Sequence, residues 1–583
     1  MPEHRRARAR TRPDGNRDRI LPAVPDRESP RLPRVDGPAR ARRIAAGRRR
    51  RFRTIPMKGR SLQVIGLGLL AAAFVFAAAR LAFRTGGGAN TDRGKIILRF
   101  AHWNLHGGLR EGYAEVIASY EQLHPEIKVE QMPVPVRVWP TWQRTQLVGG
   151  TAPDIIQLGR GTNDEVISRY FRPLTADVMQ PNPYNADTAL AAQRWRDSFY
   201  DGLTGDNVYY PNLQGVYGIP TLQMNMRAFY NRDLLEKISG SAAPPRNYQE
   251  FSVLMERAAD YARTRGGNFV PIAGSGDYAT HLFQRLLQSQ TQAELYANDT
   301  DRTRNGTLLM MGPALLRGGW TLRSPGLQNL LTLFQAIGRE MAPGFFQLKR
   351  DDALLAFAQQ SSLAILTGSW DYSLLERECP FPIVVAPMPL PTEEDPQFGR
   401  TLLGVPPEAQ SSLDAIYGVT WATAHADIAI DFLRYLVSEK VSARFAVTSQ
   451  RLPSTVGVEL PENLRPFALR TEGPVPGLNF SINDSSPDFG RWLQTNAFRL
   501  FEPGATVARF TAATESAFRE AFASDLRRMR EIHVKTSQRG DSTLVAELMG
   551  ESADETRAAK AITTQVLREM EVYRLQAALE RAP

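Results

Sequence analysis

Several residue groups in this chain have types and spacings that would suit catalysis or metal binding. His102 and His106 are four residues apart, the spacing of a metal-binding pair on one face of a helix. The pair Asp351-Asp352 and the acidic run at 392–396 would supply the two carboxylates that glycoside hydrolysis needs. The histidines fall where a strand is expected to end, without a cluster of further ligands, and the acidic groups lie in polar segments expected to be solvated surface. These groups therefore predict neither a metal site nor a glycosidase.

Two further motifs are incomplete. The stretch AGSGD at 273–277 lacks the Gly-x-Ser-x-Gly spacing that presents a nucleophilic serine. The glycine run at 86–95 has the wrong spacing for a phosphate-binding loop, and Ile96 follows it where serine or threonine is required. We therefore expect no enzyme and no cofactor.

The charge of the chain is concentrated at its N-terminus. Of the formal net charge of +10, residues 1–60 contribute +14, from 20 Lys+Arg against 6 Asp+Glu, so the remainder carries −4. The tail is rich in arginine and proline and nearly free of aromatics, which predicts disorder. Because the part that folds is mildly acidic, we expect no nucleic-acid partner.

The segment at 61–83 is apolar apart from Arg80 and is long enough to cross a bilayer as a helix. The arginines before it would keep the tail in the cytoplasm, which makes the chain a single-pass protein of the inner membrane with its bulk in the periplasm. A cleaved signal peptide is the alternative, because Ala77-Ala78-Ala79 has the form of a cleavage site; the length of the apolar run favours the anchor. Residues 1–56 are either a cytoplasmic tail or an overextension of the gene, because Met57 would also start an export signal.

The elements after the glycine-rich linker at 84–94 alternate between strands and helices. The apolar run at 95–103 predicts a strand, the helical spacing of Tyr113, Val116 and Tyr120 predicts a helix, and 127–132 predicts the next strand. A short helix and the strand at 155–158 follow. This alternation predicts a parallel sheet flanked by helices, an α/β protein. Near the C-terminus, Ile562, Val566, Met570, Tyr573 and Ala577 share one helical face, which we expect to be buried against protein.

Six motifs occur in the order that is found in the family 1 extracellular solute-binding proteins of ABC importers, the carbohydrate-binding group that includes maltose-binding protein. They are YAEVIASYEQLHPEIKV, LVGGTAPDIIQLG, GVYGIPTLQMNMRAFYNRDLLEK, PPRNYQEF, SLAILTGSWDYSLL and AIDFLRYLVSEKVSARFAV followed by RLP. Each motif is weak by itself, but together they span most of the chain from Lys95 to about Phe522. The chain therefore resembles this family.

The resemblance implies a two-lobed periplasmic-binding-protein fold of the Venus flytrap type (type II), with hinge strands that cross between the lobes. The boundaries that we expect are a first lobe at 95–222 plus 389–440, a second lobe at 223–388 plus 441–522, and a helical C-terminal extension at 523–583. In this fold the ligand lies between the lobes, near the carboxyl ends of the strands. Asp154, at the start of a strand, is expected to brace its turn instead of binding ligand.

The resemblance also implies a sugar or oligosaccharide ligand, for which a site combines aromatic platforms with polar side chains. Trp370 is the leading candidate, because it falls where maltose-binding protein has a stacking tryptophan. The other candidates are Asp371, Tyr278, Asp277, Trp103, Trp142, Arg160, Gln223 and Asn225. Two departures, Arg160 where the family protein has an aromatic and Gln223 with Asn225 where it has an acidic residue, argue against maltose itself.

The function implied is capture of the solute and its delivery to the permease subunits of an ABC importer. The alternative is a membrane-tethered sensor or scaffold, in which the same lobes would report ligand occupancy to a partner protein.

Overall fold

The computed structural model describes residues 94–580 apart from short internal gaps. The gaps are residues 106–107, 160–161, 206, 211–212, 301, 303, 305, 409–412, 481–485 and 550–554. The basic tail, the predicted membrane segment and the linker before residue 94 lie outside the described residues, as do Arg160 and His106. The chain divides into two units, 1–88 and 89–583, and the second contains everything described below. None of the helices in this described part is both long and apolar enough to span a membrane.

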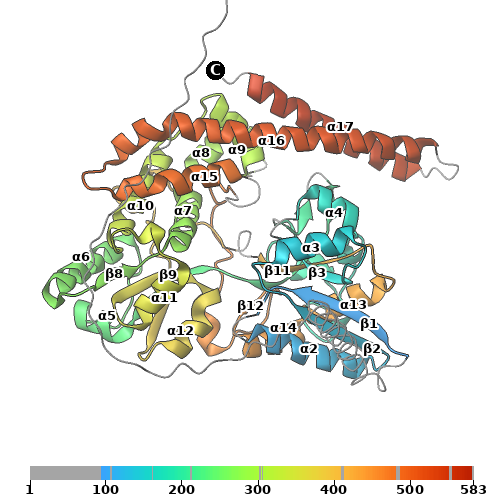
Figure 1. The fold of residues 1–583 in the computed structure, drawn as a ribbon, viewed down its shortest axis with the longest axis horizontal. Helices are drawn as coiled ribbons and strands as arrows, with labels where there is room; N and C mark the ends of the chain where they lie inside the picture. The colour runs from blue at the N-terminus through green and yellow to red at the C-terminus, as the bar shows by residue number, and fades with distance from the viewer. Residues whose placement is uncertain are drawn as a thin grey trace, which may run out of the picture. The chain divides into compact units, whose positions relative to one another are not determined.

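The first sheet has six strands in the order β12-β6-β11-β3-β1-β2 (Figure 1). The strands are β1 (Ile96–His102), β2 (Ile127–Pro133), β3 (Ile155–Gln157), β6 (Ile219–Gln223), β11 (Leu413–Val419) and β12 (Leu452–Pro453). β1 pairs in parallel with both β2 and β3, as predicted, but β11 pairs antiparallel with β3 and β6, so the sheet is mixed and not parallel throughout. The sheet packs with α2 (Leu109–Leu123), α3 (Trp139–Val148), α13 (Ala426–Leu436) and α14 (Glu439–Ser449). We call this sheet with its helices the first lobe.

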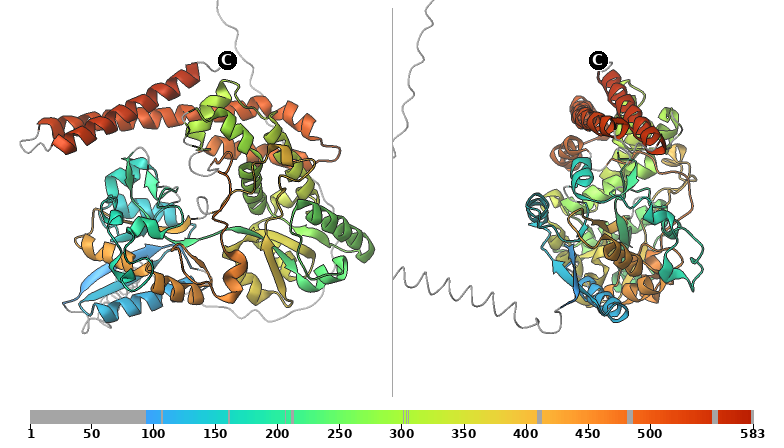
Figure 2. Two further views of the ribbon diagram at one scale, coloured as in Figure 1. Left: turned by 180° about the vertical axis from the view of Figure 1, so that it is seen from behind. Right: turned by 90° about the vertical axis from the view of Figure 1, so that its right-hand side faces the viewer.

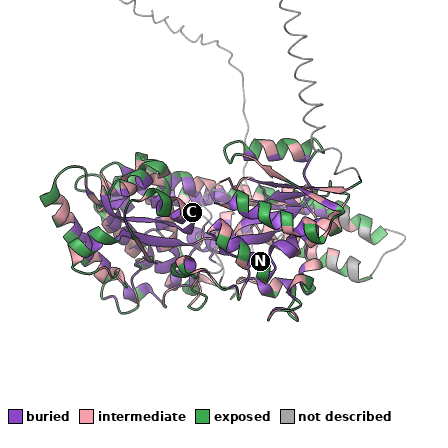
Figure 3. Cartoon of the chain, turned by 90° about the horizontal axis from the view of Figure 1, so that it is seen from below, coloured by how far each residue is buried: buried purple, intermediate pink, exposed green. Residues whose placement is uncertain are grey.

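The second sheet has four strands in the order β10-β7-β9-β8. They are β7 (Met226–Asn231), β8 (Val270–Ala273), β9 (Ser362–Gly368) and β10 (Ile383–Pro387). β6, β7 and β9 are buried along their whole lengths, as expected of apolar strands that are covered on both faces (Figure 3). The helices that pack with this sheet include α6 (Tyr248–Arg265), α7 (Gly276–Gln290), α10 (Pro325–Arg339) and α11 (Arg350–Ala358). We call this group the second lobe.

The two sheets are joined by a nearly continuous strand. β6 ends at Gln223 in the first sheet, and β7 begins at Met226 in the second. Only two residues separate strands that belong to different sheets, so this segment is a crossing connection of the kind that the resemblance implies.

The positions at which the chain passes from one lobe to the other differ from those expected from the sequence. Leu390 and Phe398 lie in the core of the second lobe, and the chain joins the first sheet only at β11. α14 and β12 lie with the first lobe, because Phe445 packs in its core and β12 pairs with β6. The expected boundaries at 389 and 441 thus lie some 10 to 25 residues before the points where the chain changes sheets, because these points depend on strand pairing between distant segments.

The chain ends in a hairpin of two helices, α16 (Val507–Met549) and α17 (Glu555–Glu580), after α15 (Pro487–Asn496) (Figure 2). α16 is continuous through the expected boundary at residue 523. The apolar face of α17 is not buried as expected: Met570 and Tyr573 are 60% and 69% exposed, and Ile562 and Val566 are also exposed. α17 instead packs through Leu575, which belongs to the core of the second lobe, and Ala578 is also buried.

Candidate functional site

The crossing segment carries two of the predicted ligand residues. Gln223 is 1% exposed, and neither amide atom of its side chain has a hydrogen-bond partner among the described residues. Asn225 donates from Nδ2 to the carbonyl of Phe467 at 2.6 Å, but its Oδ1 has no partner within the same residues. Leaving a buried polar group unsatisfied costs about 1–3 kcal/mol. A buried group left unsatisfied in this way calls for a specific explanation, of which a water or a bound solute is one.

Trp370 follows the end of β9 and is held against this segment by its neighbour Ser369. The Ser369 amide donates to the Asn225 carbonyl at 2.9 Å, and the Asn225 amide donates to Ser369 Oγ at 3.3 Å. The indole of Trp370 is half-buried and lies 5.3 Å from the His281 ring, centroid to centroid. It folds so closely over Gly368 that a Cβ there would lie 2.0 Å from a ring carbon. The glycine of the Gly-x-Trp motif is therefore required by this close approach.

Asp371 is fully buried, and protein groups occupy both of its carboxylate oxygens. It accepts hydrogen bonds from Tyr278 Oη at 2.7 Å and Arg350 Nε at 2.9 Å, and also from Thr367 Oγ1. Burial is the main cause that raises the pKa of Tyr278, and the Asp371 charge adds to it. The arrangement makes Asp371 and Tyr278 the support of the loop that carries Trp370. Asp277, the remaining candidate of this region, is exposed in the first turn of α7.

Three tryptophans of the first lobe form a cluster. Trp103, just after β1, contacts Trp139 edge-on at 5.0 Å, and Trp139 contacts Trp142 at 5.1 Å. Trp139 is fully buried, whereas Trp103 and Trp142 are half-buried. Gly159, with φ of +110°, brings the loop after β3 to within 3.4 Å of the Trp103 ring, measured from the position a Cβ would take. Trp139 was not predicted, although it precedes Trp142 by three residues, a spacing that puts both on one side of a helix.

Polar groups that the sequence did not single out line the same ends of β1, β3 and β11. Gln157 accepts a hydrogen bond from the Trp103 amide at 3.0 Å, while its own Nε2 has no partner among the described residues. Tyr417 donates to Tyr113 at 2.9 Å, and Tyr113 lies 3.4 Å from Thr221 on β6, hydroxyl to hydroxyl. Burial raises the pKa of Tyr113 to about 12, so both tyrosines stay neutral donors at physiological pH.

Arg451 connects the first-lobe sheet with the loop that carries Trp370. It precedes β12, is 7% exposed, and donates from Nη1 to the Ser369 carbonyl at 3.1 Å. Burial lowers the pKa of this guanidinium, while the charges of Asp414 and Asp371 oppose that shift. Leu452, the next residue, pairs with Gln223. A buried arginine beside the orphaned amide is the strongest feature of the site that sequence reasoning missed.

The other chemical motifs are structural. His102 lies against Gln131 at 2.9 Å, and burial lowers its pKa to about 4. Among the described residues no group of three or more His, Cys, Asp or Glu side chains is placed to hold a metal. Asp154 accepts from the Arg99 amide of β1 at 2.7 Å, so its role is structural, but it joins two strands instead of bracing its own turn as expected. Asp395, expected at the surface, is 8% exposed because it accepts from two backbone amides.

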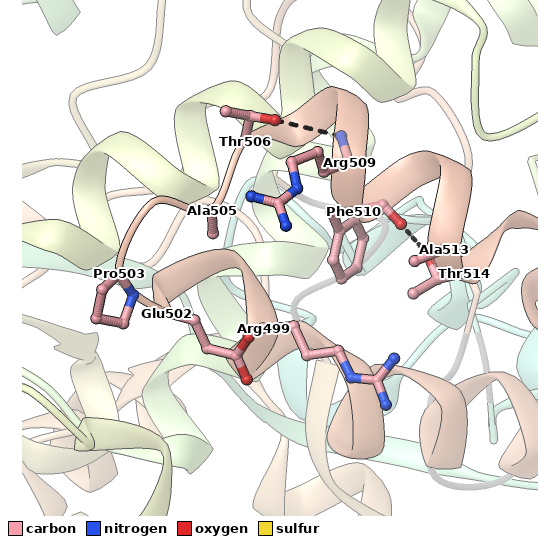
Figure 4. A pocket seen from close by; sticks show the side chains of 9 residues that line it. All are labelled: Arg499, Glu502, Pro503, Ala505, Thr506, Arg509, Phe510, Ala513 and Thr514. Carbon is pink, nitrogen blue, oxygen red and sulfur yellow. Dashed lines mark hydrogen bonds between the residues drawn. The ribbon is translucent and has the colours of Figure 1, made fainter.

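A separate hollow of about 290 Å³ lies at the start of α16 (Figure 4). None of the predicted ligand residues lines it. Its walls are Arg499, Glu502, Pro503, Ala505, Thr506, Arg509, Phe510, Ala513 and Thr514.

Comparison with known proteins agrees with this arrangement. Residues 115–465, more than half of the chain, match the family described as bacterial extracellular solute-binding protein. No curated protein matches the chain.

Three solved structures share the fold. The sugar-binding protein MalE from Xanthomonas citri is 18% identical with a TM-score of 0.52, covering 74% of this chain and 98% of that chain. A probable secreted solute-binding lipoprotein from Streptomyces coelicolor is 16% identical with a TM-score of 0.51, covering 74% and 99%. The apo form of RafE from Streptococcus pneumoniae is 16% identical with a TM-score of 0.50, covering 74% and 98%.

Proposed function

Because the chain belongs to the family of bacterial extracellular solute-binding proteins, we propose that it captures a sugar or oligosaccharide and delivers it to an ABC importer. The observation that carries the proposal is that neither amide atom of buried Gln223 has a partner in the described part of the chain. Gln223 lies two residues before Asn225, which bonds the loop of Trp370 through Ser369. A sugar presents hydroxyl groups to such an amide and an apolar C–H face to an indole. Arg451, which uses Nη1 to bond the Ser369 carbonyl, would supply further donors.

The proposed site forms between two surfaces. Trp370 and its loop belong to the second lobe, and Trp103, Trp142 and Gln157 belong to the first. A solute that contacts both surfaces binds the closed arrangement more tightly than the open one, and this difference drives closure. Asp371, Tyr278 and Asp277 take supporting roles in this proposal, and Arg160, outside the described residues, stays a candidate on the sequence alone.

We further propose that residues 61–83 hold the protein at the inner membrane with residues 95–583 in the periplasm. Tethering keeps the binding lobes at high effective concentration beside the permease. Co-purification of the full chain from membranes tests this partner: permease subunits support transport, and a signalling protein in their place supports the sensor role.

Thermal unfolding against a panel of sugars, sugar acids and polyols tests the ligand class. A solute that binds only the folded chain stabilises it by about 2.7 kcal/mol at 100 times its dissociation constant. We expect one class of sugars to raise the midpoint, and Trp370→Ala to abolish the rise.

Trp421→Ala is the matched control. Trp421 is 48% exposed and follows β11 at the end where Val419 pairs with Ile155, the start of β3, so it lies away from the proposed site. This variant should keep the sugar response. A panel without any response, from a chain that unfolds cooperatively, would refute the sugar assignment.

A further inference from the structure

The C-terminal hairpin is rooted in the second lobe. Phe518, Phe522 and Leu526 of α16 and Leu575 of α17 belong to the core of that lobe. Asp525, fully buried, accepts from the amides of Asp488 and Phe489 at the start of α15. These apolar and capping contacts fix the base of the hairpin to the second lobe.

The two helices are locked together further along. Gln565 of α17 is 4% exposed and donates from Nε2 to the Ser537 carbonyl at 3.0 Å and to Asp541 Oδ1 at 2.7 Å. Because this buried side chain joins α17 to α16, the distal part of the hairpin moves with its base as a stiff arm.

The distal part of this arm contacts the first lobe. Arg539 Nη2 donates to Glu165 Oε1 at 3.0 Å, and Thr564 Oγ1 donates to Gln214 Oε1 at 3.0 Å. Burial lowers the pKa of Arg568, and the nearby Tyr217 and Asp164 oppose this shift. Figures 1 and 2 show the hairpin passing from the second lobe to α4 (Asp164–Tyr170) of the first lobe.

The hairpin contacts α4, the helix that follows the loop after β3. Glu165 and Asp164 form the first turn of α4, which Asn163 caps by accepting from the Val166 amide at 3.0 Å. The loop between β3 and this cap closes on itself through Thr162 and Gly159, and Gly159 approaches Trp103. The hairpin therefore touches the part of the first lobe that carries one wall of the proposed sugar site.

We propose that the hairpin is a clasp between the two lobes, in which opening of the sugar site requires Arg539 to release Glu165. This inference rests on the proposed function, because the clasp would control access to the proposed sugar site. Rotation of the lobes about the crossing segment at Gln223–Met226 moves α4 away from the second lobe. Because the hairpin is stiff and anchored in the second lobe, it loses its contacts with α4 during this rotation. Before any solute binds, these contacts favour the lobe arrangement of the structure over one in which the lobes are rotated apart. The apparent affinity rises with the fraction of molecules in the arrangement that binds solute.

The size of the effect follows from the exposure of the ion pair. The side chains of Arg539 and Glu165 are 59% and 55% exposed. An exposed pair of this kind changes an equilibrium by roughly 1.4- to 5-fold. Charge reversal, which replaces attraction by repulsion, should reach the upper part of this range.

The test measures the distance between the lobes in the full chain without sugar. Spin labels are placed at Arg144→Cys on α3 and Leu355→Cys on α11, both exposed, in a Cys379→Ser background that removes the only native cysteine. Arg539→Glu and Glu165→Arg should each raise the ratio of long to short distances up to about 5-fold, and the double reversal should restore it.

Arg527→Glu is the matched control, because Arg527 on the same helix pairs with Glu520 of α16 and not with the first lobe. It should leave the distances unchanged. Single reversals without effect, or a double reversal that restores nothing, overturn the clasp. Because no sugar is present, these outcomes are independent of the ligand panel, which tests the proposed function separately.

Discussion

Replacing Gln223 by leucine tests separately what this side chain does to the stability of the sugar-free protein and to its sugar affinity. The two residues are similar in volume, and the side chain is 1% exposed with neither amide atom bonded among the described residues. Leucine removes the penalty of a buried unsatisfied amide, about 1–3 kcal/mol. Gln223→Leu should therefore raise the free energy of unfolding of the sugar-free protein by this amount. It should also weaken sugar binding by about 2- to 10-fold, the worth of one lost hydrogen bond.

Urea unfolding without ligand measures the first effect, and sugar titration measures the second. Gln335→Leu is the matched control, because Gln335 is also buried but donates from Nε2 to the Leu500 carbonyl at 2.6 Å and the Ala505 carbonyl at 3.2 Å. This variant removes the Gln335 bond to the Leu500 carbonyl, whereas the Ala505 carbonyl keeps its bond from Arg339 Nη2 at 3.0 Å. It should destabilise the protein by about 1–3 kcal/mol. If Gln223→Leu destabilises the sugar-free protein as much as Gln335→Leu does, the amide serves the fold and the argument for the site is refuted.

Three further predictions concern other parts of the structure. Gly368→Ala forces the indole of Trp370 out of its position and should weaken sugar binding as much as loss of the indole does, measured by titration; an unchanged affinity would exclude Trp370 from the site. Burial lowers the pKa of His102 to about 4, below the ~6.5 of an unfolded histidine, so the unfolded chain takes up the proton first. Stability should fall by up to about 3 kcal/mol between pH 6.5 and pH 4, and His102→Gln should flatten that decline in unfolding midpoints. Arg227→Ala removes the cation that donates to Glu408 from Nη1 at 2.7 Å and leaves this buried carboxylate with Arg285 at 3.7 Å and the Arg470 amide at 3.0 Å. The variant should cost about 3–5 kcal/mol in urea unfolding, whereas removal of both charges should cost less.

Local patterns were enough to predict the elements of the lobes. The apolar runs at 95–103 and 155–158 became β1 and β3, and the helical spacing of Tyr113, Val116 and Tyr120 became the buried face of α2. These elements are predictable because the spacing of apolar residues along the chain shows whether one face of a helix or a whole strand is buried. The motif around Trp370 was equally visible, since Gly368 and Trp370 interact within three residues.

The polar centre of the site was not predictable in the same way. Arg451 is separated from Ser369 by 82 residues and from Gln223 by more than 200, and only the pairing of β12 with β6 brings them together. Tyr113 and Tyr417 are 304 residues apart. Contacts at such separations depend on sheet order, which no local pattern encodes.

The sequence by itself determined the strands, the helices and the residues able to stack on or hydrogen-bond a solute. The tertiary structure decided which of these face a solute and which, like Asp371, are occupied by the fold. It also decided which face of α17 is buried, because the apolar face that the sequence predicted to be buried is exposed. α17 packs through Leu575 and Ala578 and leaves that face in solvent, because the position of a helix depends on where its neighbours end and not on its own pattern.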